Sequence, residues 1–298
     1  MKIVLLGKGG QVGRELLEPL AASGTLVACD RTTADLARPE TVVALLRREQ
    51  PDVIVNAAAY TAVDKAETEH DLTRLVNATA VGAIGEEAAR LGAAVVHYST
   101  DYVFDGTKAG RYVETDATAP LSVYGATKLE GEQALTASGC RHWILRTTWV
   151  YAGHGHNFVR TMLRLAKDRD ELRVVDDQFG VPTSARLVAE VTTDIVTRLA
   201  AGTAPSPGIY HLAPAGETTW CRFARFVIDT ARAQGLPLRC TPDRVAAITT
   251  ADYPLPARRP ANSRLDTTKL ETALGRTLPA WQDDVPAAVA AIAAVASF

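Results

Sequence analysis

A glycine-rich turn close to the N-terminus constrains the fold of this chain more than any other segment. Gly7, Gly10 and Gly13 follow the short apolar run 3–6, and a helical pattern of apolar residues begins at Val12. Glycines with this spacing permit a tight turn, let the backbone approach a pyrophosphate, and let the helix pack on the strand. The free N–H groups of the helix N-terminus would face the phosphates. The spacing indicates a dinucleotide-binding turn, although a glycine turn without a ligand shows the same pattern.

Strand and helix patterns then alternate about five times up to residue 150. This alternation is typical of an α/β fold with a Rossmann-like, doubly wound parallel sheet. Beyond Tyr151 the pattern loosens into helices and short strands, among them 209–212. We expect a dinucleotide-binding Rossmann domain over 1–150. We expect mainly a smaller α+β substrate-binding lobe over 151–298, with some segments returning to the first domain.

The amino-acid composition argues against some classes of binding partner. Hydrophobic residues make up 47% of the chain and charged residues 22%, with a formal net charge of −2, so no nucleic acid or membrane partner is expected. The four cysteines lack the spacing of a zinc site, which predicts reduced thiols in a cytoplasmic protein. The apolar run at the N-terminus is too short for a signal peptide. The Ala-rich tail 287–298 is too short to span a bilayer and should form a closing amphipathic helix.

An acidic residue ends the second apolar run. Asp30 follows the run 25–29 and stands seventeen residues past Gly13 (30 − 13). An acid at this place suits hydrogen bonds to the adenine ribose and repels a 2′-phosphate. Arg31 comes next and could offset that repulsion. NADH and NADPH therefore both stay open as the cofactor.

Tyr124 and Lys128 are four residues apart in a segment with helical spacing, so their side chains share one helix face. A cation beside a buried phenol lowers the pKa of the phenol toward neutrality. Such a pair can give or take a proton at a carbonyl or alcohol. Alone the spacing is weak evidence, because eight Tyr and seven Lys produce it by chance in about 0.2 places.

Small and polar side chains follow two further strand patterns. The segment Asn56–Thr61 leaves room for a flat ligand where parallel strands end, although its alanines could equally pack a helix onto the sheet. Ser99 and Thr100 follow the next strand and could bind a substrate carbonyl, although Ser and Thr are also ordinary turn residues.

Two groups of side chains in the second half could bind ions. The loop arginines Arg258, Arg259 and Arg264 suit a pyrophosphate, although solvated surface arginines would look the same. His154 and His156 have no thiol or carboxylate close in the sequence, so they do not predict a metal site.

Together these segments resemble the extended short-chain dehydrogenase/reductase superfamily and, within it, the dTDP-4-dehydrorhamnose reductase family. The resemblance rests on the glycine turn, the run Ser99–Gly106 and the Tyr124–Lys128 motif. It covers nearly the whole chain. The further matching stretches are 55–67, 97–104, 146–151, 177–183 and 259–265.

The resemblance implies NAD(P)H-dependent reduction of the 4-keto group of dTDP-4-dehydro-β-L-rhamnose, a sugar nucleotide, to give dTDP-L-rhamnose. Tyr124 would be the general acid, Thr100 would bind the carbonyl, and Lys128 would hold the nicotinamide ribose and lower the pKa of Tyr124. Asp101 and Trp149 would contact the sugar nucleotide, and Arg259 is expected to bind it as well. The expected cofactor contacts are Gly7, Gly10, Gln11, Val12, Gly13, Asp30, Asp35, Leu36, Ala59, Tyr60, Thr61, Tyr98, Tyr124 and Lys128.

The same resemblance bears on metal binding and assembly. Some family members bind magnesium through glutamates at a dimer interface, and Glu15 matches one such position. Arg186 stands where such a member has another glutamate, so no metal is expected here. Monomer and homodimer both stay open.

Three other functions occur on the same fold. A dehydratase needs a glutamate where this chain has Tyr102. An epimerase would keep its NAD bound and show no net cofactor turnover. A non-catalytic regulatory subunit, as in methionine adenosyltransferase, is disfavoured by the intact Thr100, Tyr124 and Lys128.

Overall fold

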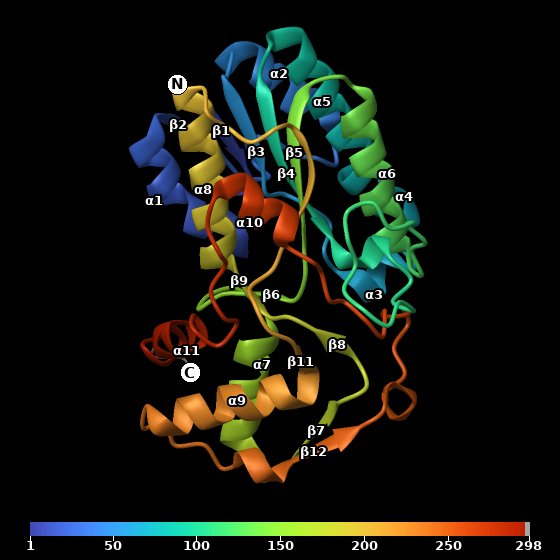
Figure 1. Cartoon of the computed structure of the whole chain (residues 1–298), viewed down its shortest axis with the longest axis vertical. Helices are drawn as coiled ribbons and strands as arrows, with labels where there is room; N and C mark the ends of the chain where they lie inside the picture. Colours follow the sequence, from blue (N-terminus) through green and yellow to red (C-terminus); the bar gives the residue numbers. More distant parts are fainter. Residues whose placement is uncertain (296–298) are drawn as a thin grey trace.

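The computed structural model describes residues 1–295 and contains a six-stranded parallel sheet (Figure 1). Its strand order is β10-β5-β4-β3-β1-β2. The expected Rossmann-like α/β sheet is thereby confirmed. The chain reverses its direction of progress across the sheet next to β1, and open α/β sheets bind ligands at such a switch point. The strands are β1 (Lys2–Leu6), β2 (Thr25–Cys29), β3 (Val53–Asn56), β4 (Ala94–Thr100), β5 (Arg141–Thr147) and β10 (Gly208–Leu212).

Helices cover both faces of this sheet, which is why its strands are almost continuously apolar. Side chains alternate between faces along a strand: Ile3 and Leu5 pack toward one helix layer, Val4 and Leu6 toward the other. The first layer consists of α1 (Gln11–Ser23), α8 (Ala185–Ala201) and α10 (Thr268–Leu274). The second consists of α2 (Pro39–Glu49), α5 (Ala80–Leu91) and α6 (Val123–Ala137).

Late segments of the chain complete the sheet. The sequence pattern assigns 209–212 to the short strands of the second lobe, but β10 instead pairs in parallel with β5. The apolar face of α8 likewise packs against α1. Both segments bury apolar surface that β5 and α1 would otherwise expose. The boundary expected at residue 150 stays a prediction.

A second lobe lies beyond the carboxyl ends of the strands (Figure 1). The helices α7 (Phe158–Asp168), α9 (Trp220–Ala233) and α11 (Val285–Ala293) share one apolar core. The last residues of the expected closing helix, 296–298, lie outside the described part of the chain. Short strand pairs border the lobe: β6 (Val150–Tyr151) with β9 (Thr183–Ser184), β7 (Leu172–Val175) with β12 (Val245–Ile248), and β8 (Phe179–Gly180) with β11 (Thr218–Thr219).

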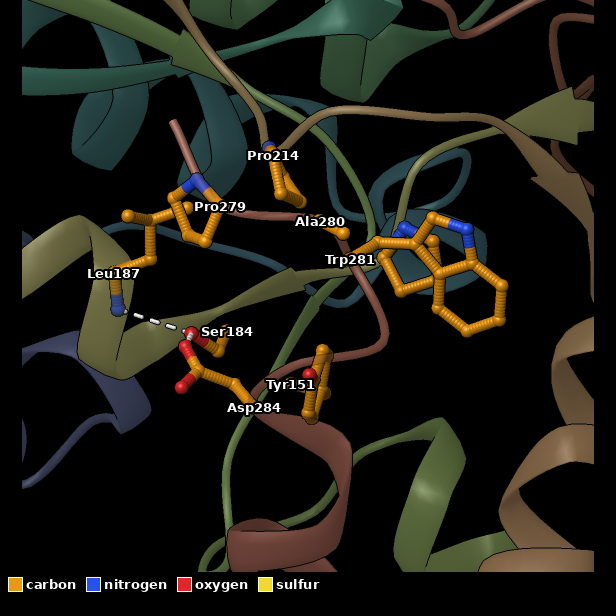
Figure 2. Close-up of a pocket in the computed structure, with 9 residues that line it drawn as sticks. Tyr151, Ser184, Leu187, Pro214, Pro279, Ala280, Trp281 and Asp284 are labelled. Carbon is orange, nitrogen blue, oxygen red and sulfur yellow. Dashed lines mark hydrogen bonds between the residues drawn. The ribbon is translucent and has the colours of Figure 1, made fainter. Parts of the chain in front are cut away.

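Two helix N-termini are joined at the seam between the sheet and the second lobe (Figure 2). The Ser184 hydroxyl accepts a hydrogen bond of 3.0 Å from Leu187 N, which caps α8, and donates to Asp284, just before α11. A cavity of about 190 Å³ adjoins this contact and is lined in part by Tyr151 and Glu15. Among residues 1–295, no helix combines the length and the apolar character needed to cross a membrane.

Candidate active site

The glycine turn joins three backbone segments at the carboxyl edge of the sheet. The N–H groups of Gly7 and Lys8 both donate to the carbonyl of Cys29, at 3.0 Å. Gly7 has φ +84°, and a Cβ there would lie 2.7 Å from Ala58 N. A Cβ at Gly13 would lie 2.0 Å from the Gly7 carbonyl oxygen. Glycine is therefore required at both positions, and the turn packs directly on the segment after β3.

The N-terminus of α1 is free to bind an anion. Gly10 precedes the helix in an extended conformation and supplies no side-chain cap, which leaves the first N–H groups of the helix available. Val12 packs on the sheet. Gln11 accepts a hydrogen bond of 2.9 Å from the Asn157 side chain, a contact that connects the turn to the second lobe.

Asp30 directly follows β2 as expected, and Lys8 is its cationic partner. Lys8 Nζ lies 3.1 Å from Asp30 Oδ2, and Thr32 donates to the same carboxylate through its hydroxyl and its N–H. The bonds from Thr32 and Lys8 lower the pKa of Asp30 to about 2. Of the neighbouring candidates, Asp35 accepts from Ala37 N, and Leu36 is buried in the core. Their contact with a cofactor stays a prediction.

A buried asparagine that the sequence analysis missed holds the loop of Ala59, Tyr60 and Thr61. Asn77 accepts from Tyr60 N at 2.8 Å and donates to Tyr60 O at 3.0 Å. It lies in the π-helical turn η1 (Leu75–Thr79), an irregularity that is frequent at functional sites. An asparagine within the long apolar helix pattern of 72–91 was the signal that could have identified it.

Thr100 and Tyr124 come together at the end of β4. The Ser122 hydroxyl caps α6 by accepting from Gly125 N at 3.2 Å. A Cβ at Gly125 would lie 2.2 Å from the Tyr102 carbonyl oxygen, so the start of α6 packs directly on the main chain after Thr100. The Thr100 side chain contacts Tyr124 and opposes the rise in its pKa.

The pKa of Tyr124 departs from the expectation. The resemblance implies that Lys128 lowers it, but burial and the nearby Asp101 raise it to about 12. Lys128 points elsewhere: its buried side chain donates to the Tyr98 carbonyl at 2.6 Å and lies 3.1 Å from His97 Nε2. In this arrangement the phenol of Tyr124 keeps its proton at neutral pH.

Polar atoms without partners collect at the ends of β4 and β5. Within residues 1–295, Arg146 Nη1 is buried without a hydrogen-bond partner, and the buried Asp101 Oδ2 makes no hydrogen bond of good geometry, although the Ser263 and Thr148 hydroxyls lie close enough to oppose the rise in the pKa of Asp101. Burial raises the pKa of Asp101 to about 6. Because buried polar groups are nearly always paired, these atoms have hydrogen bonds left for ordered water or for a polar ligand. The other atoms of this kind are the hydroxyls of Ser99, Thr147 and Thr148.

Trp149 and Arg259, which are expected to bind the substrate, already contact other parts of the protein. Trp149, with φ +48°, stacks on Trp220 of α9 with ring centroids 3.6 Å apart. Arg259 donates to both carboxylate oxygens of Asp64, at 2.6 and 2.7 Å. Substrate binding by Trp149 and Arg259 stays a prediction.

The remaining ionic candidates described here are bonded to other protein groups or exposed. Arg264 donates to the carbonyl of Ala109 at 2.7 Å, and Arg258 is exposed. His154 bonds to Glu15 at 2.8 Å. The part of the chain that the structure describes contains no group of three or more His, Cys, Asp or Glu placed to hold a metal ion.

Comparisons with known proteins agree with this arrangement. Residues 1–294 match the family model described as RmlD substrate binding domain. The dTDP-4-dehydrorhamnose reductase of Escherichia coli strain K12 is 51% identical over 286 residues, which is 95% of each chain.

Two solved structures have the same architecture over nearly the whole length. A dTDP-4-dehydrorhamnose reductase from Clostridium acetobutylicum superposes with a TM-score of 0.87 at 35% identity and covers 97% of this chain and 99% of its own. The enzyme of that name from Bacillus anthracis, solved in complex with NADP, has a TM-score of 0.86 at 31% identity and covers 95% and 96%. This chain belongs to the dTDP-4-dehydrorhamnose reductase family.

Proposed function

We propose that this chain reduces the 4-keto group of dTDP-4-dehydro-β-L-rhamnose with NADPH or NADH to give dTDP-L-rhamnose, the last step in making that sugar nucleotide. The observation that carries the proposal is the contact between Thr100 and a protonated Tyr124 at the carboxyl end of β4. Relatives at 51% and 35% identity are named for this reduction.

The residues of the glycine turn fit a dinucleotide. Side chains at Gly7 and Gly13 would clash with main chain, so glycine there permits the tight turn and the close packing of α1, while Gly10 would let the backbone approach a pyrophosphate. The uncapped start of α1 offers N–H groups to the phosphates. Asp30 would bind the adenine ribose, and Lys8 beside it provides the positive charge that a 2′-phosphate needs. When bound, the nicotinamide supplies the hydride that reaches the carbonyl carbon.

Tyr124 supplies the proton. Because its pKa is about 12, the phenol is protonated at neutral pH and has a proton to give to the ketone oxygen. The Thr100 hydroxyl donates to Asp101 Oδ1 at 3.1 Å and can turn that donor toward the same oxygen. Two donors would then stabilise the negative charge that develops as the carbonyl is reduced.

The unpartnered hydroxyls around Asp101 are suited to the polar sugar. Sugar hydroxyls would supply the hydrogen-bond partners that the buried oxygens of Asp101, Thr147 and Thr148 lack in the structure. Trp149 and Arg259 would contact the nucleotide part from the side of the second lobe. We infer that the protein acts as a monomer or homodimer in the cytoplasm, without nucleic acid or membrane as partner. Its four buried, free cysteines suit a reducing compartment.

A coupled assay tests the proposal. The purified chain is given the 4-keto-L-sugar nucleotide with NADH or NADPH, and the nicotinamide absorbance and the product are followed. Loss of absorbance with formation of dTDP-L-rhamnose is expected. An epimerised product without cofactor turnover would instead indicate an epimerase, and a co-purifying enzyme with no turnover would indicate a regulatory subunit.

A further inference from the structure

Both faces of the Trp149 indole are covered by protein. Trp220 stacks on one face, with ring centroids 3.6 Å apart and an angle of 13° between the ring planes. A Cβ added to Gly180 would lie 2.5, 2.6 and 3.0 Å from Cε2, Cζ2 and Nε1 of Trp149, which places it over a ring face. It cannot lie between the two rings, because atoms of Trp220 would then be nearer to it than those of Trp149. The main chain of Gly180 therefore covers the second face.

The edge of this indole is what remains for a ligand. Within residues 1–295, the Nε1–H of the half-buried Trp149 makes no hydrogen bond, and Nε1 is not a buried atom. Thr147, two residues earlier, is the register partner of Thr100, so the indole belongs to the strand end that forms the candidate site. An indole N–H can only donate. It therefore suits an acceptor such as a phosphate or carbonyl oxygen of a nucleotide.

A directed chain of hydrogen bonds holds Trp220. The Asp177 carboxylate can only accept, so the Thr250 hydroxyl donates its proton to it, at 2.6 Å. Thr250 Oγ1 must then accept from the NH₂ group of Gln178, at 3.1 Å. This turns the amide oxygen of Gln178 toward Trp220, whose Nε1–H donates to it at 3.2 Å. Each group has the role that its chemistry requires, so the indole of Trp220 is held in one position.

The stretch 177–183, which carried part of the family resemblance, thereby gains a structural role. Asp177 and Gln178 hold Trp220, and the missing side chain of Gly180 leaves room for Trp149. These contacts also offset the cost of the left-handed backbone of Trp149, with φ +48°. We propose that Trp220 is a positioning residue for Trp149. Together with Gly180 it holds the indole so that the Nε1–H edge, and not the ring face, binds the sugar nucleotide.

This inference rests on the proposed function for the identity of the ligand. It can be tested by nitrogen-15 NMR of the indole N–H groups, since the chain has four Trp, with dTDP as the probe and without turnover. Trp149→Phe and Trp220→Phe assign the two signals by their loss. We expect dTDP to shift the Trp149 signal. The Trp220 signal, which reports the stack and the bond to Gln178, should stay in place.

Two results of this titration would overturn the inference. If the indole of Trp149 leaves the stack to lay its face on the nucleotide, dTDP would move the Trp220 signal to its position in Trp149→Leu, where the stacked ring is missing. If the Trp149 signal does not move at saturating dTDP, the nucleotide does not bind through Nε1–H.

Substitutions test whether Trp220 acts through Trp149. Trp149→Phe removes the donor and should raise the Kd for dTDP, measured by calorimetry, about 2- to 12-fold, the usual contribution of one hydrogen bond. Trp220→Leu uncovers one face of Trp149 and should also raise the Kd, whereas Trp220→Phe keeps an aromatic stack and should raise it less. In a Trp149→Phe background, Trp220→Leu should have little further effect. An equal rise in both backgrounds would show that Trp220 does not act through Trp149, and the inference would be wrong.

The proposed function can fail separately from this inference. A chain that binds dTDP with the expected signals but does not reduce the 4-keto sugar nucleotide would contradict the proposed function and leave the inference standing. A chain that reduces the sugar while dTDP leaves the Trp149 signal in place would do the reverse.

Discussion

The sheet and the second lobe present their candidate residues in opposite states. At the carboxyl ends of β4 and β5, buried polar atoms such as Ser99 Oγ and Thr147 Oγ1 have no partner among the described residues. In and beside the second lobe, Trp149 and Arg259 are already engaged, one in an aromatic stack and the other with Asp64. The first region has unused binding capacity, whereas in the second Arg259 must exchange its contact and Trp149 has only the edge of its ring left to bind a ligand.

This difference follows from how each region is built. The strand ends are fixed by the parallel hydrogen-bond ladder of the sheet, in which Ser99 and Arg146 are register partners. Trp149 is held mainly by side-chain packing, with a backbone in the left-handed region that costs a non-glycine residue energy. We therefore expect the chemical step to depend on the sheet edge and affinity for the sugar nucleotide to depend on the second lobe.

The largest expected effect is on the sheet side. Tyr124→Phe removes the proton donor and should lower kcat by about 10²–10⁴-fold, the usual contribution of general acid catalysis. Cofactor affinity, measured by fluorescence titration, should change little, because the phenol is not needed to bind phosphate. An unchanged kcat would exclude Tyr124 as the acid.

The next largest effect is expected at Gly13, where an added side chain would clash with the main chain. Gly13→Ala places a Cβ 2.0 Å from the Gly7 carbonyl oxygen, so the turn or the helix must shift. Such overpacking costs about 1–3 kcal/mol, and cofactor affinity should fall with stability. Gly9→Ala is the matched control, because nothing lies within 4 Å of its added Cβ. Equal thermal midpoints for the two variants would contradict this description of the turn.

At Gly180, near the second lobe, an added methyl group would contact a side chain rather than the main chain. Gly180→Ala places a Cβ 2.5 Å from the Trp149 ring, which can move. Displacing the ring breaks its stack on Trp220, which should cost about 0.5–1.5 kcal/mol of folding stability, and moving Trp149 out of place should raise KM for the sugar nucleotide. kcat should stay close to wild type. A fall in kcat without a change in KM would contradict the proposal that the second lobe contributes affinity rather than chemistry. Gly110→Ala is the control, because nothing lies within 4 Å of its added Cβ.

The smallest expected effect concerns the ion pair between Asp64 and Arg259. Arg259 lowers the pKa of Asp64, so the pair stabilises the folded chain above the unfolded pKa of Asp and loses that effect as pH falls through the lower folded pKa. Because Asp64 is 38% exposed, Asp64→Asn should cost only about 0.2–1 kcal/mol at pH 7. Thermal melts at pH 7 and at strongly acidic pH check this. If the thermal midpoint of Asp64→Asn stays below that of wild type in acid, the lost stability comes from packing and not from the ion pair.

The sequence predicted the parts of the site that depend on local pattern. Glycine spacing, an acid at the end of a strand, and hydroxyls at the end of the next strand all follow from the rules of parallel sheets, and the structure places Gly7, Asp30 and Thr100 accordingly. The partners of Lys128 could not be predicted, because they are set by strand register and by a buried histidine far away in the sequence. β10 was misplaced for the same reason: its pairing with β5 is not local.

The most direct test of the central claim is a labelled turnover. NADPH carrying deuterium in place of both hydrogens at the reactive carbon of the nicotinamide is incubated with the chain and the 4-keto-L-sugar nucleotide, and the product is analysed by NMR and mass spectrometry. We predict dTDP-L-rhamnose with one deuterium at C4 of the sugar and one NADPH oxidised for each product formed. A product without deuterium at C4, or conversion without oxidation of NADPH, would contradict the reduction assigned to Thr100 and Tyr124.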